Sequence, residues 1–280
     1  MQENRSYFEE FTVVFKSNLN KSNYITINKD RKNSIETTKV NVKTKKISQF
    51  LNKEKGIYYS VKCDKFNIYE NTSYIVIAKK ICKILKELSK PFSLKKDFSV
   101  LVVGLGNSEV TADSLGTKVV NKLIVSSGDN NVGKFCFRNV FAICPSVFAK
   151  TGILTADTVL SIVKLKKPDL VIVVDSLSCK NHNLLNKSFQ INNVGLKPGG
   201  EISTITKWIN KSYLKTNIMA IGVPLVTNFT DIMAKNGDYS FFCDKDIDFI
   251  TNKWAYILAL GINIFLQDKF SLEDILFYMS

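Results

Sequence analysis

The sequence predicts an α/β protein with a mostly parallel central sheet, and three apolar runs carry this prediction. Residues 98–107 (FSVLVVGLGN), 168–177 (PDLVIVVDSL) and 217–226 (NIMAIGVPLV) are nearly continuous in aliphatic side chains. Strands buried on both faces have this pattern, and they belong to parallel sheets that helices cover on both sides. We therefore expect a three-layer fold.

Helices are expected around these strands. Residues 72–90 place apolar side chains at helical spacing, and Pro91 should stop that helix. Residues 155–167 form an amphipathic pattern with Thr155 as the expected N-cap. Because this helix lies between the first and second strands, we expect a right-handed parallel crossover. Residues 254–267 should form a mostly buried helix that closes the chain.

The N-terminal third has a different pattern of polar and apolar side chains. Short stretches such as residues 24–28 and 38–43 alternate polar and apolar side chains, which is typical of edge strands. We therefore expect a β-rich segment and a helix over residues 1–95, followed by a core over residues 96–268. No linker rich in proline or glycine separates the two parts, so the prediction is a single domain over residues 1–280.

Composition argues against several classes of protein. The six cysteines form no CxxC pair and the chain has one histidine, so we expect reduced, buried cysteines and neither a metal nor another cofactor. The strongest apolar segment, Trp254–Leu266, is too short for a membrane helix, and the N-terminus has no signal-peptide pattern. These features predict a cytoplasmic protein with no membrane partner.

The net charge is +14, which raises the question of nucleic-acid binding. The lysines are spread along the sequence, and no zinc-finger, homeodomain or RNA-recognition signature occurs. Direct nucleic-acid binding is therefore not expected, although a basic surface could attract acidic protein substrates.

Polar residues follow the predicted strands at the sheet edge where parallel sheets bind ligands. A GLGN turn (104–107) and Asp113 follow the first strand, the second strand ends at Asp175, and a turn beginning at Gly222 follows the third. The turn is not a dinucleotide fingerprint, because Glu109 stands where the third glycine is needed.

Asp113 and Asp175 are the main candidates for catalysis. Two carboxylates at a dry sheet edge repel, so one holds a proton while the other stays ionised, which supplies a general acid and a general base. Each aspartate also has a structural interpretation. Asp113 could cap a helix that begins at residue 114, and Asp175 could cap the following segment or pair with a lysine.

A nucleophilic mechanism finds less support in the sequence. The single histidine, His182, lies in a polar segment and should be a surface loop residue, and no GxSxG elbow holds a serine. Cys179 lies near His182 in the sequence, but sequence proximity does not establish a catalytic pair.

Several blocks of the sequence resemble the spore germination proteases. The stretch VVGLGNSEVTADSLGTKVV resembles the family hallmark, in which a GLGN turn precedes a Val-Thr-x-Asp-(Ala/Ser)-Leu-Gly segment. The resemblance continues in the same order through four further blocks, which are residues 144–180, 189–200, 220–228 and 241–263.

The resemblance implies an atypical aspartic endopeptidase of the spore core that degrades small acid-soluble spore proteins, is made as a zymogen and assembles into tetramers. It implies that Asp113 and Asp175 are catalytic, without a metal. Gly104, Gly106 and Asn107 would shape the turn beside them and contact substrate. The implied fold is a three-layer fold like that of the hydrogenase maturation proteases.

Some motifs depart from the family pattern. The family's Pro-Gly-Val-Leu-Gly-Gln-Thr-Gly-Ile-Glu segment reads PSVFAKTGILT here, and the glycine-rich loop at residues 198–204 reads PGGEIST. One alternative is therefore a weakened or inactive relative that binds partners. Hydrogenase maturation peptidases share a Gly-x-Gly-Asn turn and bind nickel through two acids and a histidine, so a metal-dependent peptidase using His182 is a second alternative.

Overall fold

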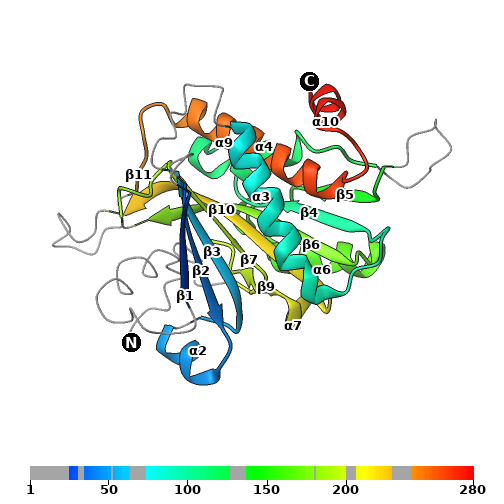
Figure 1. Cartoon of the computed structure of the whole chain (residues 1–280), viewed down its shortest axis with the longest axis horizontal. Helices are drawn as coiled ribbons and strands as arrows, with labels where there is room; N and C mark the ends of the chain where they lie inside the picture. Colours follow the sequence, from blue (N-terminus) through cyan, green and yellow to red (C-terminus); the bar gives the residue numbers. More distant parts are fainter. Residues whose placement is uncertain are drawn as a thin grey trace.

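The computed structural model describes residues 25–30, 35–51, 53–63, 74–126, 137–179, 181–199, 206–228 and 241–280. Within them, a nine-stranded sheet runs in the order β1-β2-β3-β7-β10-β6-β4-β5, and β11 pairs with β10 (Figure 1). Its strands are β1 (Ile25–Asp30), β2 (Ile35–Val42), β3 (Gly56–Cys63), β4 (Val100–Gly104), β5 (Val140–Ile143), β6 (Leu170–Cys179), β7 (Ser188–Asn192), β10 (Asn217–Asn228) and β11 (Phe241–Phe242). A separate two-stranded sheet joins β8 (Gly195–Leu196) to β9 (Ile209–Asn210).

The helices of the described residues cover both faces of the large sheet. They are α2 (Lys45–Leu51), α3 (Tyr74–Ser89), α4 (Leu115–Val120), α5 (Phe148–Thr151), α6 (Thr155–Lys166), α7 (Lys211–Leu214), α9 (Ile247–Leu266) and α10 (Leu272–Met279), with 3-10 turns η1 (Lys90–Phe92) and η2 (Thr111–Asp113). The predicted α/β class is confirmed. Strands β10, β6, β4 and β5 are mutually parallel, whereas β1, β2, β3 and β7 extend the sheet by antiparallel pairing.

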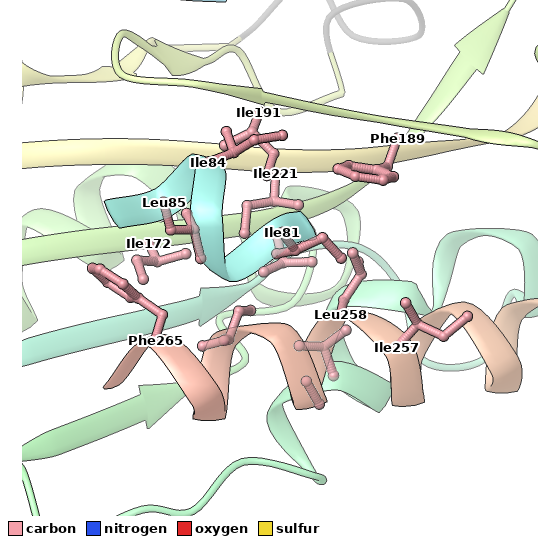
Figure 2. Packing of buried hydrophobic residues seen from close by; sticks show 14 of the residues in the cluster. Ile81, Ile84, Leu85, Ile172, Phe189, Ile191, Ile221, Ile257, Leu258 and Phe265 are labelled. Atoms are coloured by element: carbon pink, nitrogen blue, oxygen red, sulfur yellow. The ribbon is translucent and has the colours of Figure 1, made fainter. Parts of the chain in front are cut away.

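Strands β4, β6 and β10 are buried on both faces over most of their apolar runs, as those runs predict. In β4, Val100 and Val102 belong to the core beneath α3, α4 and α9, whereas Leu101 and Val103 contact the side chains of α6 and α7. Figure 2 shows the first of these cores, where α3 and α9 lie together on the sheet. Its labelled side chains come from both helices and from β6, β7 and β10.

The order of elements differs from the predicted crossover. Strands β4 and β6 are parallel neighbours, but β5 lies between them in the sequence, so α6 connects β5 to β6 rather than β4 to β6. Strand β5 escapes prediction because it contains only four residues. The N-cap of α6 is Leu154, not Thr155, whose hydroxyl donates instead to the Ser146 carbonyl at 3.2 Å.

The closing helix is longer than predicted. Helix α9 has 20 residues, starting seven residues before Trp254, so by length and composition it could cross a membrane. Most of it is buried inside the protein, and Trp254 donates its indole N–H to the Asn186 carbonyl at 3.0 Å. In this structure α9 is a core helix.

The cysteines only partly match their predicted burial. Cys63, Cys82 and Cys179 are buried, but Cys144 and Cys243 are exposed, which corrects the prediction for these two. Cys136 lies outside the described residues. Cys144 directly follows β5 and Cys243 directly follows β11. At both positions the chain leaves the sheet, and the apolar string that suggested burial has ended.

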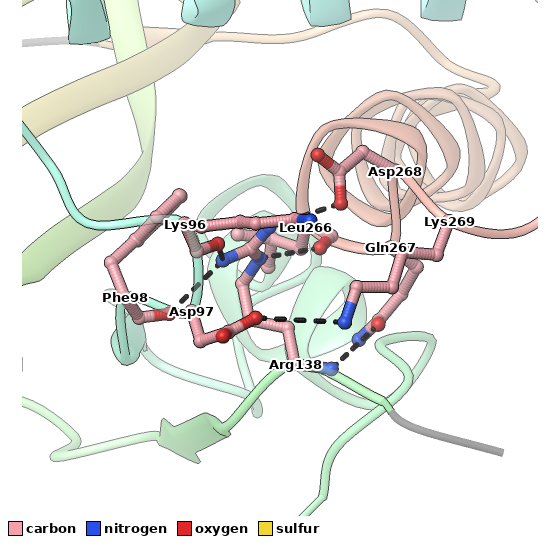
Figure 3. Close-up of polar contacts among 8 residues, drawn as sticks. All are labelled: Lys96, Asp97, Phe98, Arg138, Leu266, Gln267, Asp268 and Lys269. Carbon is pink, nitrogen blue, oxygen red and sulfur yellow. Dashed lines mark hydrogen bonds and ion pairs between the residues drawn. The ribbon is translucent and has the colours of Figure 1, made fainter.

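Arg138 links the segment that precedes β4 to the end of α9 through hydrogen bonds (Figure 3). Its Nε donates to the Leu266 carbonyl at 2.6 Å, and its Nη1 donates to the carbonyls of Lys96 and Phe98 at 2.9 and 3.3 Å. Its Nη2 reaches Asp268 at 3.0 Å. Because a guanidinium offers several donors in a fixed plane, one side chain joins three separate segments here.

Candidate active site

Asp175 lies in the middle of β6, immediately past the point where β4 ends. Gly104 is the last residue of β4 that pairs with β6, opposite Val174, and the Leu105 N–H donates to the Val174 carbonyl at 2.8 Å. Strand β6 continues to Cys179 beside β10, so the prediction that the strand ends at Asp175 is wrong. Asp175 is thus the first residue of β6 beyond the part that pairs with β4.

The position of Asp175 contradicts the interpretation that it caps the following segment. No helix follows it for Asp175 to cap, because β6 continues, and the described residues provide no salt bridge to it. Its Oδ1 accepts the N–H of Ser176 at 2.9 Å. The predicted turn at Gly222 is likewise absent, because β10 runs through this segment with a bulge after Pro224.

Asp113 ends the η2 turn that follows the GLGN segment. Its Oδ2 accepts the backbone N–H of Asn107 at 2.7 Å, so the turn holds the carboxylate from one side. The N-cap of α4 is Ser114, and no side-chain capping bond forms there. The capping interpretation of Asp113 is therefore wrong, and its carboxylate is directed to the GLGN turn instead.

Glycines allow this turn to approach η2 and α4. Gly106 has φ +102°, and a Cβ there would lie 1.9 Å from the Asp113 carbonyl oxygen. A Cβ on Gly104 would lie 2.2 Å from the carbonyl oxygen of Gly116, at the start of α4. Gly116 is a site-shaping residue that the sequence prediction missed, although it stands in the Asp-Ser-Leu-Gly segment.

The two carboxylates influence each other. Both are partly exposed, and η2 contacts β6. Burial raises the pKa of Asp175 well above its ordinary range, and the nearby charge of Asp113 raises that pKa further. Burial also raises the pKa of Asp113, while the hydrogen bond from Asn107 opposes that rise. The Asn107 N–H donates to Asp113 and the Ser176 N–H donates to Asp175, so each carboxylate has one backbone donor and the pair can hold one proton between two carboxylates.

The other candidate residues do not join the pair. His182 is exposed in the turn after β6, as predicted, whereas Cys179 is buried at the end of that strand. The described part of the chain holds no group of three His, Cys, Asp or Glu side chains that could bind a metal ion. The glycine-rich loop that departs from the family pattern lies mostly outside the described residues, at 200–205.

Gln190 is a second residue that the prediction missed. It lies in β7 opposite Gly222, which pairs on its other side with Asp175, so the three residues form one rung across the sheet. The Gln190 side chain is buried, and its Oε1 has no hydrogen-bond partner among the described residues. Strand order alone brings it near Asp175, and no local motif reveals this.

This fold and this site define an α/β protein with a paired-carboxylate site beside a glycine turn. The family model described as "Germination protease" matches residues 3–242. The chain belongs to the germination protease family, a family of peptidases, which confirms the resemblance found in the sequence.

Relatives with the same name match over much of their length. The chain is 28% identical to a germination protease of Clostridium acetobutylicum, covering 93% of this chain and 94% of that protein. It is 31% identical to one from Caldanaerobacter subterraneus, covering 90% and 78%. It is 34% identical to one from Oceanobacillus iheyensis, covering 68% and 53%.

Among solved structures, the chain is similar to the hydrogenase maturation protease HycI from Thermococcus kodakarensis. The TM-score is 0.39 at 17% identity, with 64% of this chain and 98% of that chain covered.

Proposed function

We propose that this protein is an endopeptidase that cleaves small acid-soluble spore proteins during germination, using Asp113 and Asp175 to activate water. The observation that carries the proposal is that Asp113, held by the GLGN turn, lies near Asp175, the first residue of β6 beyond its pairing with β4, so that the charge of Asp113 raises the pKa of Asp175. Membership of the germination protease family supports a peptidase, and the aspartic mechanism is our inference from the pair.

The two carboxylates would have different roles. Asp113 would be the ionised partner, with the Asn107 N–H stabilising its charge, and it would accept a proton from the attacking water. Asp175 keeps its proton to higher pH because of burial and the charge of Asp113, so it would donate to the leaving amine nitrogen. Gly104, Gly106 and Asn107 would position the turn along which the substrate backbone lies.

Digestion of a purified small acid-soluble spore protein tests the proposal. Wild-type protein should produce discrete fragments in the presence of a chelator, and Asp113→Asn and Asp175→Asn should each abolish them. Asp97→Asn, at an exposed aspartate in the segment leading into β4, is the matched control and should cleave normally. Cleavage at the wild-type rate by either site variant would contradict the assignment.

The same assay separates the two alternatives. An inactive relative would stay folded and bind the substrate without cutting it. A metal-dependent peptidase would lose activity with chelator and regain it with nickel or zinc.

The remaining parts of the proposal rest on family resemblance. They are synthesis as a zymogen, assembly into a tetramer and location in the spore core. Light scattering of the purified protein tests the tetramer, and a monomer at micromolar concentration would contradict it. Mass spectrometry of the protein from sporulating and germinating cells tests processing, and fractionation of those cells tests location.

A further inference from the structure

The edge of the sheet opposite the carboxylate pair gathers lysines that are far apart in the sequence. Strands β4, β6 and β10 are parallel neighbours, so the segments that lead into them lie side by side. These segments follow η1, α6 and α7 respectively. These segments carry Lys95, Lys96, Lys167 and Lys215, and they are preceded by Lys90 in η1 and Lys164 in the last turn of α6. All six lysines are exposed and form no salt bridge within the described residues.

Hydrogen bonds hold the three lead-in segments together. The Ser99 N–H donates to Asp169 Oδ2 at 2.8 Å, and the Asp169 N–H donates back to the Ser99 carbonyl at 3.0 Å. The Thr216 hydroxyl donates to the Pro168 carbonyl at 2.8 Å. Since neighbouring strands lie about 4.8 Å apart, the lysine-bearing backbone forms a closely spaced, fixed array.

Two of these lysines occupy a backbone conformation that favours glycine. Lys167 ends α6 with φ 49° and Lys215 ends α7 with φ 58°, both left-handed. Helix ends of this kind usually carry glycine, which adopts the conformation without steric cost. Positive charge also complements a helix C-terminus, but Lys164 already provides it in the last turn of α6. The dipole of helix α6 therefore does not explain why a lysine stands at position 167.

The acidic residues nearby are already engaged. Asp97 pairs with Lys269 at 3.5 Å, and Asp268 pairs with Arg138 at 3.0 Å. Asp169 accepts the hydrogen bonds of Ser99. None of these aspartates forms a salt bridge with the six exposed lysines, and Glu87, which lies near Lys90, is paired with Lys39 at 2.5 Å. This edge therefore presents excess positive charge to solvent.

Contrary to the expectation from the sequence, where the lysines are spread along the chain, we propose that this lysine edge binds the phosphate backbone of double-stranded nucleic acid, without reading its sequence. A duplex presents one negative charge per roughly 1.7 Å of its axis in a rigid array, which suits lysines held on a fixed backbone. An acidic polypeptide is the competing partner, but it would lose conformational freedom on docking to the same array. The edge lies away from Asp113 and Asp175, so this binding is independent of the proposed peptidase activity.

Fluorescence anisotropy with a short labelled DNA duplex tests the proposal on the full chain. The key variant is Lys167→Gly with Lys215→Gly, which removes two charges and also relieves two left-handed backbone positions. Each lost phosphate contact should reduce the slope of log affinity against log salt by about one, so the double variant should lose about two. Its thermal midpoint should stay level or rise, which separates lost binding from lost folding.

A matched control removes the same charge elsewhere. Lys79→Gln with Lys83→Gln changes two exposed lysines on α3, away from this edge, and should keep the wild-type slope. Equal weakening in both double variants would reduce the effect to net charge and overturn the proposal. Polyglutamate that displaces the duplex at equal or lower charge concentration would identify an acidic protein as the partner, which also overturns it.

Discussion

Gly106 and Asp113 are in such close contact that the turn has no room for a side chain. A Cβ at position 106 would lie 1.9 Å from the Asp113 carbonyl oxygen and 2.9 Å from its Oδ1. In the same turn, the Asn107 N–H donates to Asp113 Oδ2 at 2.7 Å. The glycine therefore controls the position of the carboxylate as well as the course of the chain.

Gly106→Ala should displace Asp113 and destabilise the fold. Relief of the clash requires movement of the turn or of η2, and alanine is also strained at φ +102°, so we expect a loss of roughly 2–4 kcal/mol in the free energy of unfolding. Urea denaturation measures the loss. Gly152→Ala is the control, because it has a left-handed backbone but no atom within 4 Å of the added Cβ. Equal losses in both variants would show that backbone strain alone matters.

Asp175→Asn should stabilise the protein at neutral pH. The pKa of Asp175 is raised in the folded state by burial and by Asp113, so folding favours its protonated form. Its contribution to stability is fully present below the unfolded pKa of about 3.9 and is lost as pH rises through the folded value. Asparagine cannot ionise, so the variant should melt a few degrees higher than wild type at pH 7.

The melting difference between Asp175→Asn and wild type should shrink as pH falls toward 4. Thermal unfolding monitored by circular dichroism at several pH values measures it. If Asp175→Asn were less stable than wild type at pH 7, the ionised carboxylate would stabilise the fold. That result would contradict a raised pKa of Asp175 in the folded protein. Asp97→Asn, which removes an exposed ion pair with Lys269, is the control and should change the melting temperature at pH 7 little.

Arg138→Ala should be among the more damaging substitutions far from the site. The side chain is 6% exposed, and its loss leaves the carbonyls of Leu266, Lys96 and Phe98 without these donors. We expect a cost of about 3 kcal/mol in the free energy of unfolding, and Arg138→Lys should recover only part of it. Lys269→Ala removes an exposed pair and should cost less than about 0.5 kcal/mol. Similar values for Arg138→Ala and Lys269→Ala would contradict the role of the guanidinium.

Local sequence signals predict the individual parallel strands better than the order in which the strands join the sheet. The apolar runs of β4, β6 and β10 are long and strongly patterned, and they place Asp113 and Asp175 on one edge once the sheet is parallel. The four-residue β5 is too short to stand out. The insertion of β7 between β3 and β10 depends on contacts between segments far apart in the chain. The Gln190 rung and the lysine edge both depend on that assembly, so no sequence window contains them.

Gln190→Met should preserve or increase stability, because the buried Oε1 has no partner among the described residues. Methionine has a similar shape and needs no hydrogen bond, so the free energy of unfolding should stay level or rise by about 1 kcal/mol. Asn192 is the matched control in the same strand. Its Oδ1 accepts the N–H groups of Val194 and Gly195, both at 2.9 Å, so Asn192→Leu should cost about 2 kcal/mol.

Urea denaturation of both strand-β7 variants tests this contrast. If Gln190 faces the substrate, Gln190→Met should also raise KM in the digestion assay while the protein remains folded. A loss of stability in Gln190→Met as large as that in Asn192→Leu would show that the amide oxygen is paired in the folded protein. In that case the place of Gln190 opposite Gly222 is structural, and the GLGN turn would position the substrate backbone without it.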